Sequence, residues 1–409
     1  MPGRNLGRSN TPSGGLSPRL LVAVTACWYL AQMGYYAQAQ LFGPVMERYS
    51  LDEAAVGLIM SQEVAMYAIT ALLMAGPVTR FPRSSIAFAG CALVLAGNLI
   101  AGFTENFEVL RVARLATGFG AGMIGAAGVA SAASSNNPQR MFAVVSVTWG
   151  LMAAGGAIIF PYVTVPFGAK GGYLLMAATV VLLLPLFRWL PPPQRNLQEE
   201  AASQALLASL PPLKRFAEKL GVRDAPNKEF ALVALLALFI YEVGQGAVQV
   251  FLEQFGLRAG LEEYRIGEVL GIAGFLGLSG GVLAAWLADR YGNLRPALIG
   301  IATNVIVAAA LALGQSPIAF AVLYLAWNMC FYFVVPYILG IMAEMDPKGR
   351  WAVATDAVWW LGAAPGPAIG GFLVAEAGYG GLAMLPVVVG VISICLFYFT
   401  LRRFYATQQ

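Results

Sequence analysis

The chain has 409 residues, of which 59% are hydrophobic and only 11% are charged, and its mean hydropathy is +0.70. Soluble domains carry about 25% charged residues, so a soluble fold could not cover this much apolar surface. The net charge of +4 does not indicate nucleic-acid binding, because the charges are distributed as in a membrane protein.

Long apolar stretches follow one another along the whole chain. A membrane-spanning helix needs roughly 20 mostly apolar residues, because it must cross about 30 Å of hydrocarbon at about 1.5 Å per residue. The apolar segment 296–343 has no charge, and only the turn at Gln315, Ser316 and Pro317 divides it into two spans. We predict twelve spans, at residues 20–42, 54–78, 85–103, 107–130, 141–165, 172–190, 230–253, 265–288, 296–313, 318–342, 351–374 and 381–401.

The segments outside these spans are polar. The arm 1–19 is rich in Gly, Ser and Pro, and the apolar run after it is too long for a signal peptide, so we expect it to stay attached. Residues 191–229 begin with three prolines and contain several charges, which is typical of a linker between two bundles at 20–190 and 230–403. We expect this linker to lie in the cytoplasm and residues 404–409 to form a short cytoplasmic tail.

Positive charges fix the predicted orientation. If both termini lie in the cytoplasm, most of the 25 Lys and Arg fall in cytoplasmic segments, as the positive-inside rule requires. The exceptions are Arg48, Arg111, Arg114, Lys170, Arg258 and Arg265. We therefore expect a protein of a bacterial inner membrane with both ends in the cytoplasm.

The two halves of the chain repeat each other at an offset of 210 residues. The repeat aligns Leu51-Asp52-Glu53 with Leu261-Glu262-Glu263 without a gap. It also pairs Gly34 with Gly244, Gly57 with Gly267, Arg80 with Arg290, Trp149 with Trp359 and Gly168 with Gly378. Six spans separate equivalent positions, so the halves should have the same topology and be related by an axis along the membrane normal. The predicted fold is an all-α membrane protein of twelve transmembrane helices in two pseudo-symmetric six-helix bundles.

Two motifs resemble those of the major facilitator superfamily. The loop Ala285-Trp286-Leu287-Ala288-Asp289-Arg290-Tyr291-Gly292-Asn293-Leu294-Arg295 is similar to the family's G-x-L-A-D-R-x-G-R-R loop, and Arg114 to Gly122 is similar to its R-L-x-x-G-x-G-x-G segment. The first copy of the loop is degenerate, with Thr79 and Pro82 at the Asp and Gly positions. The family's antiporter signature is missing from the fifth span and appears instead in the eleventh, from Gly362 to Gly371. The glycines after Arg114 allow close helix packing without any role in binding.

The resemblance implies a latch on the cytoplasmic side, formed by Arg80, Arg83, Asp289 and Arg290. Asp289 would lie near the start of a neighbouring helix, where the helix dipole favours an anion. Asn137-Pro138 and Asp346-Pro347 look like such helix starts. The simpler alternative is that these charges only mark a positive-inside loop.

Few charged residues lie at membrane depth. Glu63, Arg111, Arg114, Glu242 and Asp356 are candidates for function, because burial in hydrocarbon requires a partner, water or a substrate. A buried ion pair that only fixes helix packing is the alternative. The chain has no His, so a proton relay would have to use carboxylates, and we assign proton coupling to Glu63, Glu242 and Asp356.

The resemblance places spans 1, 4, 7 and 10 around a central cavity, and polar residues are concentrated in these spans. Gln32 and Glu242 are equivalent in the repeat and should face each other, while Glu242, Gln245 and Gln249 share one face of their helix. Arg111 and Arg114 are one turn apart and could bind a carboxylate or phosphate; alternatively, Arg114 neutralises Glu63 or Glu242. The predicted substrate-binding residues are Gln32, Tyr35, Tyr36, Arg111, Arg114, Tyr241, Glu242, Gln245, Gln249, Trp327, Asn328 and Tyr332.

These residues predict a secondary-active transporter that moves a small organic solute, such as an organic anion, by alternating access and proton coupling. A proton-driven exporter of amphiphilic drugs or lipids and a transporter-like receptor without turnover are the alternatives. An enzyme is not expected: the sequence has no P-loop for ATP and no metal-ligand cluster, so no cofactor or metal is predicted. The expected partners are the lipid bilayer, a small-molecule substrate and protons, but no nucleic acid, and the twelve-helix unit should work as a monomer.

Overall fold

The computed structural model describes residues 17–193, 225–346 and 350–407, and these residues form α-helices joined by short turns, with no β-strand among them. The predicted arm and most of the predicted linker lie outside the described residues. The helices of the N-terminal half are α1 (Pro18–Tyr49), α2 (Glu53–Leu73), α3 (Pro77–Arg80), α4 (Arg83–Phe103), α5 (Phe107–Ala133), α6 (Pro138–Ile159) and α7 (Pro161–Leu183), followed by a 3₁₀ turn at Leu184–Trp189.

The C-terminal half follows the same pattern. Its helices are α10 (Lys228–Val250), α11 (Leu252–Arg258), α12 (Glu263–Gly277), α13 (Ser279–Tyr291), α14 (Leu294–Leu313), α15 (Pro317–Met345), α16 (Arg350–Ala363) and α17 (Gly366–Ala406). The predicted division of the uncharged segment 296–343 is confirmed, since α14 ends at Leu313 and α15 begins at Pro317.

Eleven stretches of the described chain are long and apolar enough to cross a membrane. The last of them, Ala354–Ala406, has 53 residues, which is too long for one crossing. It contains Gly378 in a non-helical conformation with φ 65°, and this residue divides it into two passes. Gly168 has almost the same conformation inside α7, with φ 59°. These two glycines are 210 residues apart, so the repeat seen in the sequence is also present in the backbone.

Short polar side chains begin several of these helices. Asp52 accepts a hydrogen bond from the backbone N–H of Ala55 at 2.8 Å, and Asn106 accepts one from Glu108 at 2.9 Å. Asn137 accepts one from Arg140 at 3.0 Å, so the predicted helix start at Asn137-Pro138 is confirmed. Asp346 instead ends α15, and the three residues after it lie outside the described part.

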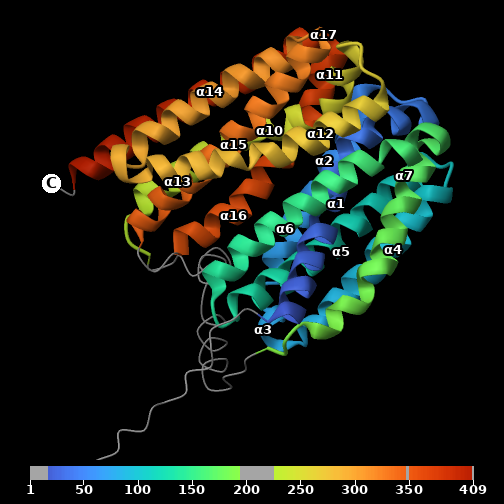
Figure 1. Cartoon of the computed structure of the whole chain (residues 1–409), viewed down its shortest axis with the longest axis horizontal. Helices are drawn as coiled ribbons and strands as arrows, with labels where there is room; N and C mark the ends of the chain where they lie inside the picture. Colours follow the sequence, from blue (N-terminus) through green and yellow to red (C-terminus); the bar gives the residue numbers. More distant parts are fainter. Residues whose placement is uncertain (1–16, 194–224, 347–349, 408–409) are drawn as a thin grey trace, which may run out of the picture.

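The two halves form two bundles that contact each other at one end of the molecule (Figure 1). That end, where α11 lies, is called the far end here. The opposite end carries most of the described positive charges, namely Arg19, Arg80, Arg83, Arg140, Arg188, Lys228, Arg290, Arg295, Arg402 and Arg403, and is called the basic end. The bundles diverge toward the basic end in Figure 1, around α3 on one side and α13 on the other.

Glycines in α5 allow the N-terminal bundle to pack closely. A Cβ added at Gly120 would lie 2.9 Å from the Leu93 side chain of α4, and one at Gly122 would lie 2.6 Å from the Tyr67 carbonyl of α2. These close approaches place α5 tightly against both neighbours, as the glycine pattern after Arg114 predicts.

Candidate functional site

A large central cavity of about 970 Å³ lies between the two bundles. Residues of α1, α6, α10, α15 and α16 line it, together with parts of α2, α5, α12 and α13. At its basic end the lining includes Val147, Val282 and Leu339, which are exposed to solvent or lipid. Because the two bundles also diverge at this end (Figure 1), the cavity opens toward the basic end.

The far end of the molecule is closed by two equivalent helix contacts. A Cβ added at Gly57 of α2 would meet the Pro367 carbonyl of α17, and one added at Gly267 of α12 would meet the Ala157 carbonyl of α6. Gly57 and Gly267 are repeat partners, and so are Ala157 and Pro367, since both pairs differ by 210. Ser61 adds a hydrogen bond across the first contact, accepting from the Ala368 N–H at 2.8 Å.

Gln32 and Glu242 both line the central cavity, one from each bundle. Glu242 is only 1% exposed, and its Oε1 atom has no hydrogen-bond partner among the described residues. Both amide atoms of Gln245 on the same helix are also unpartnered there. Buried polar atoms are normally hydrogen-bonded, so this face of α10 lacks partners that water or a ligand could supply.

The polar face of α10 matches the predicted spacing. Glu242, Gln245 and Gln249 all line the cavity, as do Trp327, Asn328 and Tyr332 of α15 and Tyr35 and Tyr36 of α1. Asp356 of α16 is exposed to the same space. The structure thus brings together most of the residues that the sequence proposes for binding.

Aromatic side chains outside the predicted set of binding residues complete the wall of the cavity. Trp28, Tyr67, Trp149, Trp359 and Trp360 line the cavity. The ring of Trp360 lies 5.3 Å from that of Tyr35 and 4.9 Å from that of Tyr67, so this cluster joins the two halves. Trp149 and Trp359 are repeat partners inside spans, and that signal was available in the sequence.

Arg114 does not face the cavity, contrary to expectation. It is 2% exposed inside the N-terminal bundle, where its Nε donates to Glu63 at 3.1 Å and its Nη2 forms a second contact with the same carboxylate. Its Nη1 donates to Asn98 at 2.9 Å, and its guanidinium lies 5.1 Å from the Tyr173 ring centre. Of the two alternatives for Arg114, the structure has the pairing with Glu63.

Arg111 and Tyr241 also lie elsewhere. Arg111 forms a surface ion pair with Glu108 at 3.0 Å, so it cannot join Arg114 in an inward-facing anion site. The Tyr241 hydroxyl turns into the C-terminal bundle and donates to Asn304 at 2.8 Å. Residue spacing along a helix cannot tell a face that lines the cavity from one that packs inside the bundle, because each helix of a bundle buries more than one side.

Among the predicted latch residues, the structure describes the side chains of Arg80, Arg83 and Arg290. Arg83 is buried and donates to Ser134 at 2.5 Å, which ties α4 to the end of α5. Arg290 lies over the Trp286 ring at 4.4 Å, and Arg80 is exposed at the end of α3. The side chain of Asp289 lies outside the described residues.

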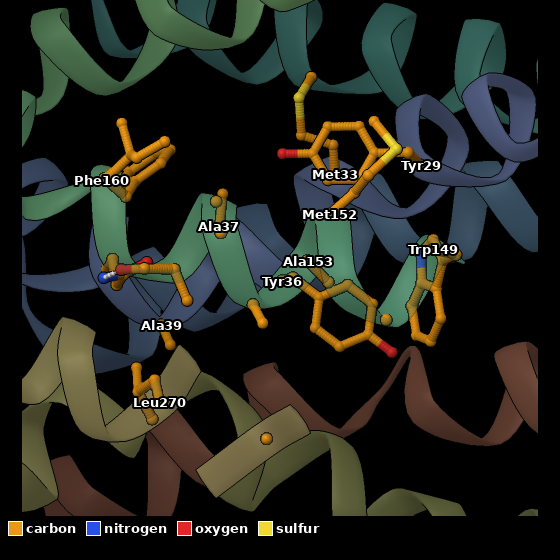
Figure 2. Close-up of a pocket in the computed structure, with 18 of the residues that line it drawn as sticks. Tyr29, Met33, Tyr36, Ala37, Ala39, Trp149, Met152, Ala153, Phe160 and Leu270 are labelled. Atoms are coloured by element: carbon orange, nitrogen blue, oxygen red, sulfur yellow. Dashed lines mark hydrogen bonds between the residues drawn. The ribbon is translucent and has the colours of Figure 1, made fainter. Parts of the chain in front are cut away.

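A smaller side cavity of about 310 Å³ lies beside the central one, between α1, α6, α7 and α12. Figure 2 shows Met33 and Met152 close together on one side of it and Tyr36 next to Trp149 on the other. Its lining is mostly apolar, from residues such as Ala37, Ala153 and Leu270. Gln249, Asn328 and Tyr332 line both cavities, as do Tyr36 and Trp149.

Comparison with known sequences decides the family. The sequence model of the Major Facilitator Superfamily matches residues 28–357, which is most of the chain. The chain belongs to the major facilitator superfamily. No curated protein sequence matches it.

Solved structures of major facilitator transporters share the fold. A mutant of a peptide transporter POT matches with a TM-score of 0.68 and 16% identity over 97% of this chain and 95% of its own. A D-xylose-proton symporter matches with a TM-score of 0.70 and 16% identity over 93% of this chain and 97% of its own. As a superfamily member, this chain is an integral membrane protein and a secondary transporter rather than an enzyme. Among the described residues, no group of His, Cys, Asp and Glu could hold a metal ion.

Proposed function

We propose that the chain is a proton-coupled transporter that moves a small organic solute by alternating access, with Glu242 as the proton-carrying group. The observation that carries this proposal is the Glu242 carboxylate, which is buried on the wall of the central cavity and whose Oε1 atom has no hydrogen-bond partner among the described residues. A buried carboxylate without a cationic partner is costly in its charged form, so a proton or a cationic ligand stabilises it. One of the solved structures that share this fold is a D-xylose-proton symporter, so the fold is compatible with proton coupling.

Alternating access is supported by the two ends of the molecule. The cavity opens at the basic end, while the repeat-related contacts of Gly57 and Gly267 close the far end. Two similar bundles can rock about a central site and exchange these states. We assign the basic end to the cytoplasm of a bacterial inner membrane by the positive-inside rule, and one chain encloses the whole pathway as a monomer.

The charges in the cavity favour a cationic or neutral substrate over an organic anion. Among its described lining residues, Glu242 and Asp356 are acidic, and none is Lys or Arg. The anion hypothesis depends on Arg111 and Arg114, which lie outside the cavity. Tryptophan and tyrosine rings around two carboxylates are the surroundings that organic cations prefer. Glu63 is already neutralised by Arg114, so we assign it to helix packing rather than to proton coupling.

The test has two stages. A thermal-shift screen of the purified chain against organic cations, anions, sugars and amino acids identifies a ligand, because binding stabilises the folded form. Proteoliposomes with a trapped pH indicator then report proton movement when that ligand is added. We expect wild type and Glu108→Gln to couple ligand and proton fluxes, since Glu108 is an exposed partner of Arg111. Glu242→Gln should lose the proton signal and keep ligand exchange. Full proton coupling in Glu242→Gln would refute the assignment.

A further inference from the structure

The side cavity and the central cavity are separated by a thin aromatic partition. The rings of Tyr36 and Trp149 lie 5.2 Å apart in an edge-to-face arrangement, and both side chains line both cavities. Figure 2 shows these two rings side by side at one edge of the side cavity. The partition consists of side chains rather than backbone, so rotation about side-chain bonds can connect the two spaces.

The side cavity also reaches the surface of the bundle that faces the membrane. Its lining includes Ile159 of α6, which is 54% exposed, and Leu182 of α7, which is 75% exposed. α6 packs on α1 and α12 but has few contacts with α7, although the two helices follow each other in the chain. The side cavity is therefore lined by exposed side chains of two helices that pack only sparsely against each other.

The two cavities differ in chemistry in a way that fits one class of molecule. The central cavity presents Glu242 and Asp356 among aromatic rings, which complements a cation. The side cavity presents methionine, alanine, leucine and phenylalanine, which complement a hydrocarbon chain. Both volumes fall in the roughly 300–1,000 Å³ range of small-molecule sites.

We propose that the side cavity takes the hydrocarbon chain of a single-chain amphiphilic cation whose charged head binds near Glu242 and Asp356. The molecule enters from the lipid between α6 and α7, and its chain passes the partition of Tyr36 and Trp149. This inference depends on the proposed transport function and specifies its substrate class.

Gly155 offers a way to fill the side cavity without disturbing the packing. It lines this cavity, and a Cβ built on it has no neighbour within 4 Å, so a larger side chain enters open space. Gly380 in α17 has equally open surroundings and does not line either cavity. Gly155→Leu therefore places a leucine in the proposed site, and Gly380→Leu is the matched control that places one outside it.

The experiment measures equilibrium binding to the full chain in lipid nanodiscs, with no proton gradient. Dodecyltrimethylammonium is the long probe, phenyltrimethylammonium is the short one, and dodecanesulfonate is an anion with the same chain. Partition of each probe into lipid cancels when variants are compared. We expect Gly155→Leu to weaken dodecyltrimethylammonium binding about tenfold, because the leucine side chain occupies space in the cavity that the dodecyl chain would otherwise fill, and to leave phenyltrimethylammonium binding unchanged. Gly380→Leu should behave as wild type, and dodecanesulfonate should not compete.

Unaltered binding of the long cation in Gly155→Leu would overturn the proposal. So would an equal loss for both cations, or equal competition by dodecanesulfonate. Retained binding of the short cation shows that the variant is folded. The binding assay involves no proton movement, so its result is independent of proton coupling. The substrate proposal can be refuted while Glu242→Gln still abolishes coupling, and it can hold even if the chain does not couple protons.

Discussion

Glu63 on α2 and Arg114 on α5 form a two-contact ion pair inside the N-terminal bundle. Tyr35 and Tyr67 lie between this pair and the central cavity, since they line both that cavity and the small pocket beside Glu63. Removing one member leaves the other charge buried and unpaired, which typically costs about 3–5 kcal/mol. We expect Glu63→Gln and Arg114→Gln each to lower the thermal unfolding temperature in detergent sharply.

The double variant tests the coupling. Glu63→Gln with Arg114→Gln removes both charges, so its loss of stability should be smaller than the sum of the single losses. Glu108→Gln with Arg111→Gln is a matched surface control, because that pair is exposed and such pairs contribute about 0–1 kcal/mol. Additive single losses at Glu63 and Arg114 would show that the two side chains do not depend on each other.

Asn304 connects two helices that line the cavity. Its Oδ1 accepts a hydrogen bond from the Tyr241 hydroxyl at 2.8 Å, and its Nδ2 donates to the Trp327 carbonyl at 3.1 Å. It is fully buried, so Asn304→Ala should cost about 1–3 kcal/mol by leaving these groups unpaired. Tyr241→Phe removes only one bond and should cost less. Chemical unfolding of reconstituted protein measures both, and equal costs would contradict this account.

Arg48 and Arg258 perform the same task in the two halves. Arg48 donates to the carbonyls of Ala101, Gly102 and Thr104 at the end of α4, and Arg258 donates to Ala312 at the end of α14. Arg48→Lys should keep the charge but lose most of these bonds, because Lys lacks the planar fork of the guanidinium. We expect Arg48→Lys to lower the unfolding temperature nearly as much as Arg48→Ala. Full stability of the Lys variant would show that charge alone caps α4.

Much of this fold could be predicted because the bilayer restricts what the chain can do. Length and hydropathy predict the spans, and the repeat pairs Gly168 with Gly378, whose backbone conformations match in the structure. The sequence predicts the site where polar side chains occur in otherwise apolar helices, because such side chains need a water-filled cavity. Glu242 and Gln245 are examples.

The remaining parts of the site depend on which face each helix turns inward. The sequence places both Arg114 and Glu242 at membrane depth. In the structure Arg114 lies in the core of the N-terminal bundle, whereas Glu242 lies on the wall of the central cavity. The distinction depends on Glu63, which lies 51 residues from Arg114 in the chain, and on Gly34, whose missing side chain leaves room for that carboxylate. The sequence does not predict the side cavity, because the sparse packing of α6 against α7 depends on tertiary contacts that no local sequence pattern encodes.

The closed far end gives the last prediction. Gly57 lies so close to the Pro367 carbonyl that any side chain there must separate α2 from α17, and Gly267 has the same relationship to Ala157. Gly57→Leu should therefore disfavour the state that is closed at the far end and leave the other state unaffected. Ser61 is 8% exposed in this contact, so a cysteine at that position reports its opening.

In a background with Cys27, Cys91, Cys330 and Cys395 replaced by serine, Ser61→Cys should react slowly with a membrane-impermeant maleimide. Adding Gly57→Leu should raise its labelling rate, and adding Gly267→Leu should do so as well, because the two contacts close the same end. Gly380→Leu has open surroundings and should leave the rate unchanged. If only Gly57→Leu accelerates labelling, its effect is local strain around position 61. Acceleration by Gly267→Leu, from the other side of the pseudo-symmetry axis, requires that the two bundles separate as rigid units.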